Sequence, residues 1–167
     1  MSTKIVLAGD VGGTTTRFGV FEFSGTRPQT IASQAYRTVD PSGVSGIAAA
    51  FLREHGIEAS ALAGVCIGAA GPVRDGVVCL TNAPVVVDAD AIARALGLSR
   101  VSLLNDLEAL AYAVPVLGAD DVVVLQEGRA VAGGAIAVIA AGTGLGEAAL
   151  YTVNGQPVAM ASEGGRA

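Results

Sequence analysis

The sequence has few charged and aromatic residues for its length. Charged residues make up 15% and aromatic residues 4% of the 167 residues, whereas hydrophobic residues reach 51%. This composition predicts a globular chain whose core is built from small side chains, and it excludes a disordered one. The net charge of −5 and the pI near 4.7 argue against a nucleic-acid-binding surface, which is normally basic.

Long apolar runs are also missing. The mean hydropathy is high at +0.57, but no run reaches the ~20 apolar residues that a membrane-spanning helix needs. Asp10 interrupts the first apolar stretch, so we expect that this stretch is not a signal peptide. Cys66 and Cys79 lie in strand-like runs and suit small hydrophobic roles in a reducing compartment. We therefore expect a cytoplasmic protein that binds neither nucleic acid nor a membrane.

A glycine-rich loop near the N-terminus is the first candidate site. Residues 9–16 read Gly-Asp-Val-Gly-Gly-Thr-Thr-Thr, between the apolar run 5–8 and a strand-like run at 17–21. A dinucleotide fingerprint or a P-loop would lead into a helix, whereas this loop joins two strands. Glycine N–H groups and threonine hydroxyls can face phosphate oxygens, and Asp10 can hold the water shell of Mg²⁺. A tight hairpin with Asp10 as a turn residue is the alternative interpretation.

A second loop of the same kind strengthens the phosphate interpretation. The strand-like run 135–141 is followed by Gly142-Thr143-Gly144-Leu145-Gly146 and by another strand-like run at 148–153. Two such loops, far apart in the chain, suggest a nucleotide that is held from two sides.

Between these loops the pattern alternates between strands and helices. Apolar residues at 44, 47, 48, 51 and 52 have helical spacing, and His55 follows in the last turn, where it suits a helix end better than catalysis. The run 63–70 predicts a buried parallel strand. Asp106 stands where the strand 101–104 passes into a helix, at the sheet edge where α/β proteins bind ligands. An N-cap role for Asn105 or Asp106 is the alternative.

The pattern predicts an α/β layered domain over residues 1–117 and the beginning of a second domain over residues 118–167. In the second part we expect strands at 122–125, 136–141, 148–153 and 158–161, without covering helices. Because a sheet with an uncovered face is seldom a whole domain, we expect the chain to be an N-terminal piece of a longer protein.

The order of several short motifs resembles the bacterial glucokinase family, over nearly the whole chain. These motifs are Gly9-Asp10-Val11-Gly12-Gly13-Thr14, Ala69-Ala70-Gly71-Pro72-Val73, Thr81-Asn82-Ala83-Pro84, Leu104-Asn105-Asp106, Ala141-Gly142-Thr143-Gly144-Leu145-Gly146 and Glu163-Gly164-Gly165. The resemblance implies the ribonuclease H-like, actin-like ATPase fold, with a complete small domain and the first strands of the large one. It implies ATP-dependent phosphorylation of glucose, the first step of glycolysis, although the 167-residue chain alone is expected to be inactive.

The resemblance also assigns residues. Asp106 would be the catalytic base toward the 6-hydroxyl of the sugar, and Asn105, Glu163 and Arg166 would contact other parts of the sugar. ATP phosphates would be bound by Gly9, Asp10, Val11, Gly12, Gly13, Thr14, Thr15, Gly142, Thr143 and Gly144, with Asp10 also reaching Mg²⁺ through water. A homodimer is compatible with the resemblance.

Four departures from the family pattern leave alternatives open, and the largest is that family members are about twice as long as this chain. The other three are substitutions within the motifs. Arg166 replaces the usual histidine, Val85 replaces a tryptophan, and Thr15 replaces an asparagine. Arg166 keeps a kinase for another hexose or an amino sugar in view. A non-catalytic sugar-sensing protein of the same fold is a further alternative, although no DNA-binding helix pair precedes the first strand.

Overall fold

A computed structural model of the chain describes residues 4–23, 27–81, 83–129, 131–141, 145–162 and 164. The chain divides into two compact units, Met1–Asp106 and Leu107–Ala167. This division falls earlier than residue 117, where the sequence places the domain boundary. Each unit is described by itself below.

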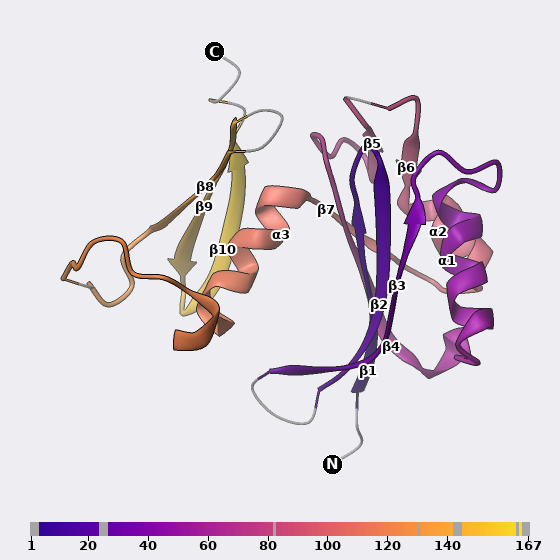
Figure 1. Cartoon of the computed structure of the whole chain (residues 1–167), viewed down its shortest axis with the longest axis horizontal. Helices are drawn as coiled ribbons and strands as arrows, with labels where there is room; N and C mark the ends of the chain where they lie inside the picture. The colour runs from indigo at the N-terminus through magenta and orange to yellow at the C-terminus, as the bar shows by residue number, and fades with distance from the viewer. Residues whose placement is uncertain are drawn as a thin grey trace. The chain divides into compact units, whose positions relative to one another are not determined.

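The first unit is built on a five-stranded mixed sheet with the order β3-β2-β1-β4-β7 (Figure 1). Its strands are β1 (Lys4–Val11), β2 (Thr15–Phe23), β3 (Pro28–Arg37), β4 (Leu62–Ala69) and β7 (Ser102–Asn105). The first three strands are antiparallel, whereas β4 runs parallel to β1 and β7 runs parallel to β4. The predicted pair of strands around the first glycine loop and the predicted parallel strand at 63–70 are thereby confirmed.

Two helices cover one face of this sheet, α1 (Gly43–Glu54) and α2 (Ala89–Leu96). The predicted helical face of α1 is buried, and Phe51 packs on Phe18 of β2 with ring centroids 6.0 Å apart. Asp88 caps α2 by accepting a hydrogen bond from the Ala91 backbone N–H at 3.0 Å, and Gly97 ends that helix in the left-handed conformation. Because alternate residues of each strand face the helices, the sheet and helices share one continuous core.

A small two-stranded sheet lies between β4 and α2 in the chain. The strands β5 (Val77–Cys79) and β6 (Val86–Asp88) are antiparallel. A tight turn precedes β5, with Asp75 and Gly76 at positive φ and reciprocal 2.9 Å backbone hydrogen bonds between Arg74 and Val77. Val85 is partly buried against the main core, and its carbonyl accepts a 3.0 Å hydrogen bond from the Leu80 backbone N–H.

The second unit contains a three-stranded antiparallel sheet with the order β10-β9-β8 and the helix α3. The strands are β8 (Ile136–Ala141), β9 (Leu145–Val153) and β10 (Gln156–Ser162), and α3 spans Asp106–Ala113. Short 3-10 turns occur at Ala59–Ala61 in the first unit and at Val114–Val116 and Ala119–Asp121 in the second. No helix in the described part of the chain is long and apolar enough to cross a membrane.

Two expectations for the second unit were wrong. Residues 122–125 do not form a strand, and Val123 and Leu125 are 85% and 95% exposed. In the described structure no other strand pairs with this segment, so its strand-forming side chains do not produce a strand. The sheet is also not free of helices, because Ala111 of α3 is buried in one cluster with Val138, Leu150 and their neighbours. The helix that the sequence assigns to the first domain therefore packs on the second sheet.

Phe51 provides a test of the first unit's core. Phe51→Ala should lower the free energy of unfolding by about 3–5 kcal/mol, because the side chain is fully buried and leaves a cavity. Phe23→Ala, on an exposed phenylalanine of β2, should have a much smaller effect. Urea unfolding followed by circular dichroism measures both, and equal losses would contradict the assigned core.

Tyr36 on β3 provides a test at alkaline pH. Partial burial, then the 2.9 Å hydrogen bond to Glu54 Oε2 and the charge of Glu54, raise the pKa of Tyr36 from 10.0 to about 12. Because the folded pKa is the higher one, this stabilisation is complete below pH 10 and is lost as the pH rises toward 12. Glu54→Gln should lower the pKa of Tyr36, and ultraviolet titration of tyrosinate should show the shift.

The matched control for this titration is Glu58→Gln, an exposed carboxylate just beyond α1. It should leave the Tyr36 titration unchanged. If both variants titrate like the unaltered chain, the Glu54 hydrogen bond does not control Tyr36.

Candidate functional site

The carboxyl ends of three parallel strands meet at one edge of the first sheet. Val11 at the end of β1 pairs with Ala69 at the end of β4, and Ala69 pairs with Asn105 at the end of β7. These residues form one row across the sheet. The segments that leave the row, the glycine loop after Val11 and the Asn105–Asp106 junction, are therefore held at the same edge.

The glycine loop is a tight turn between β1 and β2. Val11 pairs with Thr16, and the Gly12 backbone N–H donates to the Thr15 carbonyl at 3.0 Å. A Cβ on Gly12 would lie 3.3 Å from that carbonyl oxygen, so a larger residue would crowd the turn. Thr14 and Thr15 are exposed, which leaves their side chains available to a ligand.

Two buried threonines fix this loop from behind. Thr38 Oγ1 donates to the Gly12 carbonyl at 2.7 Å, and the Thr38 backbone N–H donates to the Thr14 carbonyl at 3.1 Å. Thr16 Oγ1 lies 3.0 Å from Thr38 Oγ1. Since the Thr38 proton is used on Gly12, Thr16 is the donor of that bond. The loop is thus attached to the end of β3 without any charged group.

Thr16 and Thr38 were not among the residues that the sequence singled out. Thr16 occupies an inward position of β2, two residues before the buried Phe18. A threonine among the inward-facing residues of a strand indicates that its hydroxyl has a hydrogen-bond partner in the core. Here that partner, Thr38, lies 22 residues further along the chain. Only the pairing of β2 with β3 brings the two hydroxyls together.

Asp10 lies on the sheet face opposite α1, since its neighbour Val11 is buried against the helices. Its Oδ2 is 3.9 Å from Arg17 Nη1, and the Asp10 and Arg17 side chains are 67% and 63% exposed. At this exposure the ion pair contributes little to stability and leaves the carboxylate accessible. Among the described residues no group of three or more His, Cys, Asp or Glu could hold a metal ion. A single exposed carboxylate such as Asp10 could contact a polyphosphate-bound Mg²⁺ only through the water shell of the ion.

Asn105 and Asp106 occupy the end of β7 and the start of α3. Asn105 is buried, and its Nδ2 donates to the Gly71 carbonyl at 3.0 Å, which ties β7 to the segment after β4. Gly71 has no room for a side chain, because a Cβ would lie 3.0 Å from Val78 Cγ1 and 3.1 Å from the Cys79 carbonyl oxygen. Asp106 is the first residue of α3 and is half-buried. A carboxylate at this position is stabilised by the helix dipole.

The remaining predicted site residues lie outside the described residues. These are Gly142, Thr143, Gly144, Glu163 and Arg166. The strands on either side of residues 142–144 agree with the predicted strand–loop–strand pattern, since β8 ends at Ala141 and β9 begins at Leu145. The expectation that the two glycine loops face each other across a nucleotide stays a prediction.

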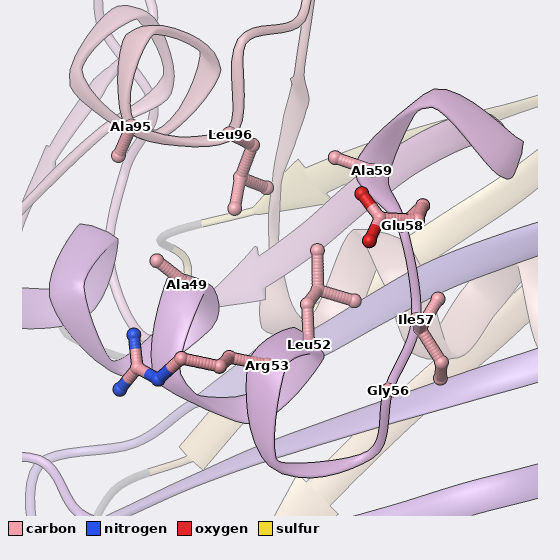
Figure 2. A pocket seen from close by; sticks show the side chains of 9 residues that line it. All are labelled: Ala49, Leu52, Arg53, Gly56, Ile57, Glu58, Ala59, Ala95 and Leu96. Carbon is pink, nitrogen blue, oxygen red and sulfur yellow. The ribbon is translucent and has the colours of Figure 1, made fainter.

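A separate hollow lies between the C-terminal ends of α1 and α2 (Figure 2). It has a volume of about 290 Å³ and is lined by Ala49, Leu52, Arg53, Gly56, Ile57, Glu58, Ala59, Ala95 and Leu96. Its loop residues lead into the amino end of β4, whereas the candidate residues follow the carboxyl ends of the strands. The hollow is therefore not part of the candidate site.

The family model described as Glucokinase matches residues 7–167. This chain belongs to the glucokinase family. The predicted family resemblance is confirmed by this match, which covers nearly the whole chain.

Curated glucokinases give the same result over part of their length. The glucokinase of Caulobacter vibrioides (strain NA1000 / CB15N) is 36% identical over 159 residues, which are 95% of this chain and 47% of the relative. The glucokinase of Salmonella typhi is 32% identical over 164 residues, covering 98% of this chain and 49% of the relative. The chain thus spans about half the length of the curated glucokinases that it matches.

Solved structures of the family support the fold. The crystal structure of a glucokinase from an Antarctic psychrotroph matches with a TM-score of 0.84 and 27% identity, over 98% of this chain and 51% of that one. A Balamuthia mandrillaris glucokinase in complex with glucose matches with a TM-score of 0.67 and 22% identity, over 97% and 48% of the two chains, which supports the fold alone. The mixed sheets and helices of this glucokinase-family chain thus form the α/β fold of glucokinases and sugar kinases.

The buried threonine pair behind the loop can be tested directly. Thr38→Val keeps the shape but leaves the Gly12 carbonyl and the Thr16 hydroxyl without their partner, at a cost of about 1–3 kcal/mol of stability. The Gly12 amide should also exchange its hydrogen faster. Thr30→Val on the exposed part of β3 is the matched control and should change neither quantity.

Thermal melts and amide hydrogen exchange measure these effects. A Thr38→Val protein as stable as the control, with an unchanged Gly12 amide, would show that the loop does not depend on the threonine pair.

Proposed function

We propose that this chain carries the phosphate-binding and sugar-binding residues of an enzyme that phosphorylates glucose to glucose 6-phosphate with ATP. The observation that supports it most strongly is the row formed by Val11, Ala69 and Asn105. The glycine loop after Val11, which is suited to binding phosphates, and the carboxylate of Asp106, which could accept a proton from a sugar hydroxyl, both follow residues of this row. Family membership favours glucose as the acceptor.

In this proposal the first glycine loop binds ATP phosphates. Residues 13–15 offer backbone N–H groups, and Thr14 and Thr15 offer exposed hydroxyls, in a turn that Thr38 holds through the Gly12 carbonyl. Phosphoryl transfer depends on alignment and charge neutralisation more than on covalent help, so a rigid cradle suits it. Mg²⁺ would neutralise phosphate charge, with Asp10 orienting its water shell. Gly142, Thr143 and Gly144 are proposed to bind the phosphates from the other side.

Asp106 is the proposed catalytic base. The acceptor hydroxyl must lose its proton to a nearby group, and a carboxylate at the sheet edge can accept it. The fixed start of α3 and the neighbouring Asn105–Gly71 hydrogen bond would hold Asp106 in a constant direction. Asn105, Glu163 and Arg166 are proposed to contact the sugar.

The wider assignments belong to the same proposal. The first part of the chain would correspond to the small domain and the second to the first strands of the large domain of an actin-like ATPase fold. We propose a cytoplasmic location and regard a homodimer as compatible with the family. Arg166, which replaces the family histidine at a proposed sugar contact, favours another hexose or an amino sugar as the second candidate substrate.

Asp106→Asn tests the proposed reaction. The test uses the chain joined to the half of the Caulobacter vibrioides glucokinase that it does not match, so that the protein has the length of the relatives. The kcat for glucose phosphorylation should fall by about 10²–10⁴-fold, because an amide cannot accept the proton. The KM for ATP and the thermal midpoint should stay nearly unchanged, because asparagine preserves the shape.

The matched control is Asp88→Asn, the same chemical change at the start of α2. Asparagine caps a helix as well as aspartate, so this variant should retain kcat and stability. If Asp106→Asn retains near-normal kcat while the parent is active, the base must be a different group. If the parent is active only on another hexose, the assignment of glucose is wrong.

A further inference from the structure

The hollow between the last turns of α1 and α2 has an apolar floor. Leu52 and Leu96 are buried in the core beneath it, and Ile57 packs against the same core. Small side chains, Ala49 of α1 and Ala95 of α2, stand beside this floor and leave it open (Figure 2). The volume of about 290 Å³ lies just below the range of roughly 300–1,000 Å³ that is typical of ligand pockets. The hollow therefore fits a small molecule and not a nucleotide.

Both helices end beside the hollow in the same way. Gly56 follows α1 and Gly97 follows α2, both at positive φ. After Gly56, the Ile57 backbone N–H donates to the Leu52 carbonyl at 2.9 Å, which holds the loop against the helix. Because the carboxyl end of a helix carries a partial negative charge, two helices that end at one hollow favour a cation there.

Glu58 is the acidic residue of the hollow. Figure 2 shows its carboxylate turned inward, whereas the Arg53 guanidinium extends outward on the other side of Leu52. Among the described residues neither Glu58 nor Arg53 forms an ion pair. The other basic residue at these helix ends, Arg94, does not line the hollow. The inward carboxylate is thus available to a ligand.

We propose that the hollow binds a small aliphatic ammonium compound. Its hydrocarbon part would cover Leu52 and Leu96, and its ammonium group would donate to Glu58. Removal of the hydrocarbon from water would provide most of the affinity. The charge-assisted hydrogen bond to Glu58 would select an ammonium group over a hydroxyl or a carboxylate. This site is separate from the residues proposed to bind ATP and sugar, which follow the carboxyl ends of the strands.

Two classes of metabolite have this chemistry, the aliphatic amino acids and the aliphatic monoamines. An amino acid also has a carboxylate, which Arg53 can reach because its side chain is long and exposed. A monoamine has no group for Arg53 to bind. The effect of Arg53→Gln on each compound therefore distinguishes the two sources.

Titration of the 167-residue chain with four probes of one branched carbon skeleton tests the proposal. The probes are isopentylamine, leucine, isopentanol and isocaproate, and amide chemical shifts of Leu52, Gly56 and Leu96 report on binding. Isopentylamine or leucine should bind with a dissociation constant on the order of 1 mM, since each has few non-hydrogen atoms. Isopentanol and isocaproate should bind about fivefold more weakly or less, because neither offers an ammonium group to Glu58.

Matched variants locate the effect. Glu58→Gln removes the charge and keeps the shape, so it should weaken isopentylamine binding by about fivefold. Glu54→Gln is the control, because the Glu54 carboxylate accepts hydrogen bonds from Tyr36 and Gln34 and does not line the hollow. This control should bind as the parent does. Ala95→Leu, at an exposed position, should fill the hollow and abolish binding without changing the circular dichroism melt.

The outcomes decide the proposal without any measurement of glucose phosphorylation. It is overturned by equal binding of the amine, the alcohol and the acid, by a parent that responds to no probe, or by undiminished isopentylamine binding in Glu58→Gln. Shifts that grow with protein concentration and not with probe concentration would place a second copy in the hollow, which also overturns it. Leucine binding that weakens in Arg53→Gln, with isopentylamine binding unchanged, would identify an amino acid as the ligand. Tighter binding of isopentylamine than of leucine would identify a monoamine.

Discussion

The candidate site depends on the position of β1 at the centre of the first sheet. This strand pairs antiparallel with β2 on one side and parallel with β4 on the other. The antiparallel partner turns the chain back through a tight loop, whereas the parallel partners bring further strand ends to the same edge. A single strand thereby joins a loop suited to phosphates to the Asn105–Asp106 junction. Either pairing alone would leave one of these features without the other.

The rigidity of the glycine loop comes from uncharged groups. Thr16 and Thr38 are fully buried and bonded to each other, and Thr38 also bonds the carbonyl of Gly12. Buried hydroxyls that are fully paired hold a backbone in place without changing the charge of the site. The charged Asp10 and Arg17, by contrast, lie on the exposed face. The structure thus separates the groups that shape the loop from the groups that can meet an anion and its metal ion.

The two units use helices differently. In the first unit α1 and α2 share one extended core with the five-stranded sheet. In the second unit the core is a smaller cluster, which includes Val138 and Leu150 and packs with α3. On the other face of the β8–β10 sheet, Ile139, Tyr151 and Met160 are exposed.

Local pattern determined the elements of this chain more reliably than their partners. The helical spacing at residues 44–52 and the glycine loop between β1 and β2 were readable, because each depends on neighbours in the chain. Residues 122–125 have strand-forming side chains but no strand, because a strand exists only where another strand accepts its hydrogen bonds. The alignment of Val11, Ala69 and Asn105, the Thr16–Thr38 bond and the packing of α3 on β8–β10 required the tertiary structure. Each of these joins residues far apart in sequence, and periodicity within a segment contains no information about which distant segment completes it.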